Sequence, residues 1–286
     1  MQEYLTHHGD RALAAVPAAG WISMELYTFD RLRTGDGWID PTLRGILYSA
    51  LGEWDTDLYV SNAVGIPMLM RLGGNDTSVP PWHLRRFARL VDQASSEPLA
   101  VGISEVAGEG HWWDTIMDDE VLAPFYDAAI QQDGLPPLPR IVDVVTLNPA
   151  TTTGKGGVRI DQLRKPYRLA RASIDRGEGD GSVGPWVIVT QNVKRFSFYT
   201  LPSRPLPSAG VVIDGSVFVG SPPAEGDGAH YCISEPESEP CTLPGVGSCK
   251  ISEPPPEPPV WRLCEGDEGT EWMQSERSAS NYGPLR

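Results

Sequence analysis

The sequence predicts an α/β fold followed by a small all-β domain and a largely disordered tail rich in proline and glutamate. In the first 133 residues, short apolar runs alternate with helical patterns, which is typical of a parallel sheet covered by helices. After residue 140, valine, isoleucine and aromatic residues alternate with glycine turns, which indicates short antiparallel strands. Residues 221–259 consist mainly of proline, glutamate, serine and glycine, so they have too little apolar surface to offset the entropy of ordering.

In the first region we expect three parallel strands, at residues 12–19, 66–72 and 99–106. The second run is almost wholly apolar, as in strands that are buried on both faces of a sheet. A closing helix is predicted over residues 118–130.

A helix is predicted between the second and third strands, over residues 78–91. Proline near its start suits the first turn of a helix. Its apolar residues fall on one face, at Leu84, Phe87, Leu90 and Val91. The local order is therefore strand, helix, strand.

A carboxylate and an imidazole follow these two strands. Asp76 comes directly after Gly73-Gly74-Asn75, and His111 follows the glycine-rich turn after the third strand. The carboxyl ends of parallel strands meet at one edge of a sheet, so we expect the two side chains within hydrogen-bonding reach, about 2.6 to 3.2 Å. Taken alone, such an aspartate is more often a turn or cap residue and such a histidine more often packing. Their order and their matching positions favour a catalytic pair.

The residues around this pair resemble a known family. IPMLMRLGGNDTSVPPWHLRRF and ISEVAGEGHWWDTIMDDEVLAPFYD resemble the end of the catalytic domain of prolyl oligopeptidase-type serine peptidases. MQEYLTHHGDRALAAVPAAGW resembles the end of the helix behind the nucleophile elbow, followed by the next strand. The resemblance implies a partial α/β-hydrolase sheet over residues 1–133, in which Asp76 is the acid and His111 the base of a Ser-Asp-His triad.

The nucleophile of such a triad is not among these residues. The Gly-x-Ser-x-Gly pattern of a nucleophile elbow does not occur in the sequence, and Ser61, Ser78 and Ser104 lack the turn that it needs. We interpret these three serines as structural and expect the nucleophile upstream of Met1. The isolated chain is therefore predicted to be inactive.

Two tryptophans follow the base. Neighbouring residues at the start of a helix point about 100° apart, so we expect one of Trp112 and Trp113 to line the substrate pocket and the other to pack into the core. His83 is expected at the surface or beside the site. His7 and His8 are interpreted as a solvated helix end.

Three functions are compatible with these residues. The first is a peptidase of the prolyl oligopeptidase type, the second an esterase with the same triad, and the third a non-catalytic interaction module on an inactive α/β remnant. The first two imply a peptide or ester substrate and no cofactor or metal. A net charge of −15 and a pI near 4.7 argue against nucleic acid as a partner, and no apolar run approaches the roughly 20 residues of a membrane span.

The remaining chain divides by composition. The predicted segments are a proline-rich linker at 134–140, a β-sandwich-like domain at 141–220, the disordered segment at 221–259 and a C-terminal segment at 260–286. Strands of the β domain are expected at 141–147, 158–163, 185–199 and 210–219. The stretch Gly154-Lys155-Gly156-Gly157 lacks the spacing of a phosphate-binding loop and is interpreted as a hairpin turn.

All four cysteines fall late in the chain, at Cys232, Cys241, Cys249 and Cys264. They contain no Cys-x-x-Cys pair, so a zinc site is disfavoured even with His230 nearby. Cysteines clustered in a segment with little core favour disulfides and hence an oxidising compartment. This pattern favours a secreted protein.

Overall fold

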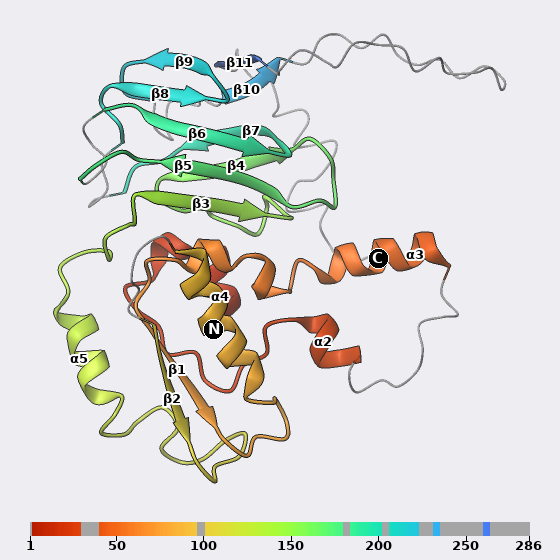
Figure 1. Ribbon diagram of the computed structural model, residues 1–286, viewed down its shortest axis with the longest axis vertical. Helices are drawn as coiled ribbons and strands as arrows, with labels where there is room; N and C mark the ends of the chain where they lie inside the picture. Colours follow the sequence, from red (N-terminus) through yellow and green to blue (C-terminus); the bar gives the residue numbers. More distant parts are fainter. Residues whose placement is uncertain are drawn as a thin grey trace.

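The computed structural model describes residues 2–29, 40–95, 101–179, 184–201, 206–222, 231–234 and 260–263. Figure 1 shows two β-sheets stacked at one end and a helix-rich region with two further strands at the other. The first 133 residues form the helix-rich region, and both stacked sheets come from residues after 140. In the described part of the chain, no helix is long and apolar enough to cross a membrane.

The helix-rich region contains five α-helices and three short 3-10 helices among the described residues. In chain order these are α1 (Gln2–His7), η1 (Gly9–Arg11), α2 (Met24–Phe29), α3 (Pro41–Leu51), η3 (Thr56–Leu58), η4 (Val60–Ala63), α4 (Trp82–Ala94) and α5 (Ala123–Gln131). Sequence analysis predicted no element where α2 and α3 lie. The closing helix expected from residue 118 begins at Ala123, because residues 115–122 form turns.

The parallel pairing predicted for the second and third strands is confirmed. β1 (Met68–Gly73) pairs with β2 (Val101–Val106) from Met68 opposite Val101 to Gly73 opposite Val106. Residues 12–19 run parallel to β1 on its other side, with backbone bonds such as Ala15 N to Pro67 O at 2.9 Å and Arg71 N to Pro17 O at 2.8 Å. This third segment forms isolated bridges and no full strand. Pro17 contributes to this because it has no N–H to donate.

Helix α4 connects β1 to β2 and covers this small sheet. Its buried face includes Leu84, Phe87 and Val91, as the spacing predicted. These side chains pack with Met68, Met70 and Leu72 of β1 in one apolar cluster. The helix therefore fixes the crossover between the two strands, and with it the relative position of the loops that follow them.

The residues after 140 form two sheets. The strands are β3 (Ile141–Thr146), β4 (Val158–Leu163), β5 (Ala170–Asp175), β6 (Trp186–Gln191), β7 (Val193–Phe198), β8 (Gly210–Ile213), β9 (Ser216–Val219), β10 (Tyr231–Ser234) and β11 (Val260–Leu263). One sheet has the order β3-β5-β6-β8-β9 and the other β11-β10-β7-β4. Neighbouring strands are antiparallel except β6 and β8. Buried side chains of both sheets form one core, in agreement with the expected sandwich.

Three strand predictions in this region need correction. Residues 210–219 form two antiparallel strands, β8 and β9, because Asp214 and Gly215 have φ values of +46° and +89° and turn the chain between them. Residues 185–199 form two strands, because Asn192 has a φ of +57° and turns the chain from β6 into β7, which belongs to the other sheet. Strand β5 was not predicted at all. Its sequence, ARASID, has few of the β-branched and aromatic residues that mark a strand.

The expectation that residues 221–259 are disordered is wrong at residues 231–234, which form β10 and pair with β7 and β11. The side chains of Tyr231 and of Trp261 on β11 are 2% and 3% exposed and pack in the core of the sandwich, so they supply the apolar area that the composition lacks. Cys232 on β10 is disulfide-bonded, as the cysteine pattern predicted. Cys241, Cys249, Cys264 and His230 lie outside the described residues.

Polar contacts join the helix-rich region to the β-sandwich. The Asn62 side chain donates to the backbone oxygens of Thr6 and Val145 and accepts from Val145 N, at 2.7 to 2.9 Å. Asp10 accepts from the Tyr199 hydroxyl at 2.6 Å. The predicted linker at 134–140 contains no helix or strand. The two regions therefore share a buried, hydrogen-bonded boundary.

Candidate active site

The loops that follow β1 and β2 are hydrogen-bonded to each other. Gly74 N donates to Val106 O and Asn75 N donates to Glu109 O, both at 2.8 Å. Gly73 sits where these loops approach most closely, and a Cβ at this position would lie 2.6 Å from Glu109 O. Only glycine lets the two backbones come this close.

This contact brings the predicted pair together. Asp76 Oδ2 lies 2.9 Å from His111 Nδ1, so the predicted distance is confirmed. The Asp76 side chain is 1% exposed, whereas that of His111 is 43% exposed. A buried carboxylate therefore holds Nδ1 of an imidazole that is partly exposed to solvent.

The Asp76 carboxylate is held by the backbone on its other oxygen. Oδ1 accepts from Ser78 N at 2.8 Å and from Val79 N at 2.9 Å. These bonds are those of a turn-capping aspartate, so the structural role considered for Asp76 is also present. Backbone donors to one oxygen leave the second oxygen for His111. The two roles are compatible in one side chain.

Arg71 fixes the chain that follows the histidine. Its side chain is 2% exposed, and it donates to Ile116 O at 3.2 Å, to Ser104 Oγ at 2.6 Å and to the Asp119 carboxylate. Its guanidinium also lies 5.3 Å from the centre of the Trp113 ring. Sequence analysis gave Arg71 no role, although a charged residue in an otherwise apolar strand is a signal that it has a buried partner.

The two tryptophans after His111 differ in burial. Trp112 is 65% exposed, while Trp113 is half-buried against Arg71. No helix begins at these residues, contrary to the assumption behind the prediction, so the helical angle between neighbours does not set their directions. Trp112 directly follows His111 in the sequence and is exposed to solvent. Its part in a substrate pocket stays a prediction.

The environments of His83, His7 and His8 differ from those predicted from the sequence. His83 is 1% exposed and stacks on Trp82 with ring centres 3.8 Å apart, so a surface position is wrong. His7 is 4% exposed, so it is not part of a solvated helix end. Burial lowers the pKa of His7 and, together with the charge of Arg11, that of His8.

The serines considered as nucleophiles are engaged in structural contacts or lie away from the imidazole. The Ser104 hydroxyl accepts from Arg71, and the backbone N–H of Ser78 donates to Asp76 Oδ1. Ser61 is buried in η4. Among the residues that the structure describes, none of these hydroxyls is hydrogen-bonded to His111. The described residues also contain no group of three or more histidine, cysteine or acidic side chains placed to hold a metal ion.

Comparisons with known proteins give two similarities. The chain is 31% identical over 219 residues to an uncharacterized secreted protein of Arthroderma benhamiae, which covers 76% of this chain and 23% of that protein. The chain thus spans about a quarter of the length of this relative. Among solved structures, TT1662 from Thermus thermophilus aligns with 46% of this chain and 50% of its own, with 18% identity and a TM-score of 0.33. A likeness of that extent does not define a fold. No protein-family model matches the chain.

Proposed function

We propose that Asp76 and His111 are the acid and base of a serine-type hydrolase that cleaves peptide bonds by acyl transfer. The observation that carries the proposal is the hydrogen bond of 2.9 Å between a buried carboxylate and Nδ1 of a solvent-accessible imidazole, at the ends of two adjacent parallel strands. In serine hydrolases the carboxylate holds Nδ1 in this way, so that Nε2 is left to act as the base.

The chemistry assigned to this chain is a proton transfer. Asp76 accepts from Nδ1–H and fixes the tautomer of the imidazole. Nε2 of His111 then takes the proton of a hydroxyl nucleophile as the hydroxyl attacks the acyl carbon, and passes that proton to the leaving group. The carboxylate stabilises the imidazolium formed between these steps.

The hydroxyl is assigned to a different part of a longer protein. The described serines make no hydrogen bond to His111, and the matched relative is about four times as long as the part that this chain spans. The choice of a peptide over an ester substrate rests on the sequence resemblance to prolyl oligopeptidase-type peptidases. The disulfide at Cys232 and the secreted relative favour action outside the cell.

The first experiment uses a serine-directed fluorophosphonate probe, which labels only an activated hydroxyl. We expect no labelling of the 286-residue chain and labelling of a longer protein that contains this chain and a Gly-x-Ser-x-Gly segment. His111→Ala should abolish that labelling. Labelling that survives His111→Ala would remove the base assignment, and a longer protein that is never labelled would favour the non-catalytic module.

The second experiment compares turnover of an aminoacyl nitroanilide with that of a nitrophenyl ester by the longer protein. Asp76→Asn should lower turnover by as much as about ten-thousand-fold, since the amide holds the imidazole in the wrong tautomer. Asp114→Asn is the matched control, because Asp114 is exposed and close in sequence to His111. Equal activities of the two asparagine variants would refute the acid role, and turnover of the ester alone would identify an esterase.

A further inference from the structure

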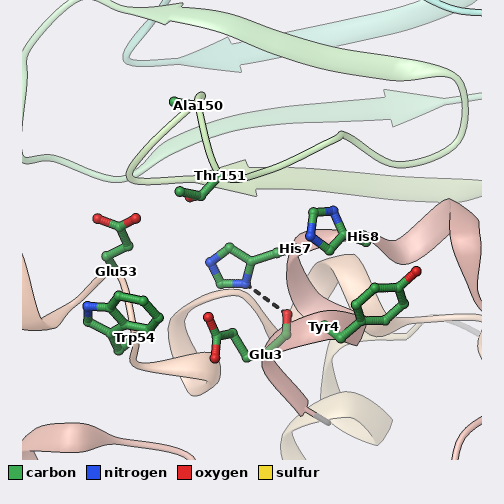
Figure 2. A pocket seen from close by; sticks show the side chains of 8 residues that line it. All are labelled: Glu3, Tyr4, His7, His8, Glu53, Trp54, Ala150 and Thr151. Atoms are coloured by element: carbon green, nitrogen blue, oxygen red, sulfur yellow. Dashed lines mark hydrogen bonds between the residues drawn. The ribbon is translucent and has the colours of Figure 1, made fainter. Parts of the chain in front are cut away.

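A second site lies at the boundary between the helix-rich region and the β-sandwich. An open pocket of about 520 Å³ is lined by residues of α1 and the residue after it, by Glu53 and Trp54 after α3, and by Ala150 and Thr151 after β3 (Figure 2). The carboxyl ends of β1 and β2, where the Asp76 and His111 loops begin, point away from the sandwich (Figure 1). The pocket is therefore separate from the candidate active site.

Two carboxylates line this pocket without a cationic partner. Glu53 Oε1 accepts from the neutral amide of Asn148 at 2.9 Å. The Glu3 carboxylate makes no hydrogen bond or ion pair with another described residue. The backbone oxygen of Glu3 lies 3.0 Å from His7 Nδ1 and accepts from the Thr6 hydroxyl at 3.1 Å. Within the described residues, no lysine or arginine pairs with either carboxylate. Among the described residues, no cation is therefore paired with the two carboxylates of this pocket.

The neighbouring imidazoles do not supply the missing positive charge. Burial lowers the pKa of the His7 ring, which lies 4.4 Å from the Tyr59 ring centre inside the boundary. The pKa of His8 is lowered as well. Burial thus disfavours the charged form of both rings, although Glu3 and Glu53 partly oppose this effect at His7.

The walls of the pocket include two aromatic rings. Tyr4 is 47% exposed and Trp54 is 44% exposed. In Figure 2 they lie on opposite sides of His7, with the Glu3 carboxylate below the His7 ring and the Glu53 carboxylate above Trp54. Aromatic faces next to carboxylates suit a cation that also carries an apolar part, because the ring attracts the charge and covers the carbon chain.

We propose that this pocket binds an organic cation with N–H donors, an alkylguanidinium or alkylammonium group, between Glu3 and Glu53 and against Trp54. The N–H groups donate to the two carboxylates, and the alkyl chain packs on the indole. Because the cation binds the folded chain, binding raises the temperature of unfolding.

The test uses the full chain and three probes of nearly equal shape: N-butylguanidinium, N-butylammonium and the neutral N-butylurea. Calorimetry and thermal unfolding should show binding of the two cations and none of the urea. Glu53→Gln keeps the oxygen that accepts from Asn148 but removes the charge, so it should weaken cation binding about tenfold. Glu120→Gln, at an exposed position away from the pocket, should leave binding unchanged.

Two further variants keep the test decisive. Glu3→Gln changes an exposed side chain on α1 and should weaken binding about as much as Glu53→Gln without a risk to folding. Trp54→Leu should weaken binding by a smaller factor, about threefold, through loss of the ring face. Equal binding of N-butylurea, no binding of either cation to the folded chain, or cation affinities that are unchanged in both glutamine variants would overturn the proposal.

Discussion

Replacement of Gly73 by alanine tests whether the contact between the strand-end loops positions Asp76 and His111. A Cβ at this position would lie 2.6 Å from Glu109 O and closer still to Gly110 O, whereas ordinary contact begins at 3.4 Å. The facing backbone must therefore move by at least 0.8 Å. Overpacking of this kind typically costs about 1 to 3 kcal/mol. Because the displaced residues directly precede His111, we also expect a longer or broken hydrogen bond to Asp76.

Denaturant unfolding measures the change in stability, and nitrogen NMR of the imidazole reports whether Nδ1 still carries the proton shared with Asp76. Gly110→Ala is the matched control, since a Cβ there meets nothing within 4 Å and its φ is not positive. We expect Gly73→Ala to be less stable than Gly110→Ala and to lose the Nδ1–H signature. If the two alanine variants have the same stability and the same imidazole spectrum, the loop contact does not position the histidine.

Three further predictions concern buried polar side chains. Arg71→Met should destabilise the chain by about 3 kcal/mol in a denaturant titration, since it leaves the partly buried Asp119 without its ion-pair partner. Arg85→Met is the control and should have little effect, because the ion pair that it removes is exposed. Asn62→Ala should lower the free energy of unfolding by about 2 to 3 kcal/mol, because two buried backbone oxygens and one backbone N–H lose their partner. An Asn62→Ala variant that is more stable than Arg85→Met would contradict this prediction. Burial lowers the pKa of His7 below the ordinary imidazole value of 6.5. The unfolded chain therefore binds more protons at this residue, and stability should fall as the pH drops through 6.5. His7→Asn should flatten that part of the stability profile, and an unchanged profile would argue against the burial effect.

Several features of the site follow from local sequence. Asp76 and His111 could be placed at strand ends because apolar runs and glycine turns precede both residues. The helix between them was predictable from the spacing of Leu84, Phe87 and Val91, since a 3.6-residue period specifies one buried face. In the β region, the strands with clear valine and aromatic runs were predicted. Strand β5 was missed, because its alanine- and serine-containing sequence carries a weak strand signal.

The roles of several residues depend on partners that are distant in the chain. Gly73 could be recognised as a turn residue, but its close approach to Glu109 and Gly110 arises only when the two strands pair. His7 looks like a helix-end residue, yet the packing of α1 against η3, η4 and the sandwich buries it. Similarly, Arg71 gains its partners from residues 104 to 119, which fold back onto β1 after the crossover.

The sequence by itself determined the elements β1, α4 and β2 and the placing of Asp76 and His111 after the two strands, because hydrophobic periodicity and turn residues are encoded locally. The tertiary structure decided the distance between Asp76 and His111, the burial of Arg71 and the assembly of the pocket from α1, the turn after α3 and the loop after β3. It also decided that Tyr231 and Trp261 extend the sandwich beyond the boundary that composition suggested. These outcomes depend on which surfaces of the folded chain pack together. The burial of a side chain by distant residues, or a hydrogen bond to them, leaves no signal in the local sequence.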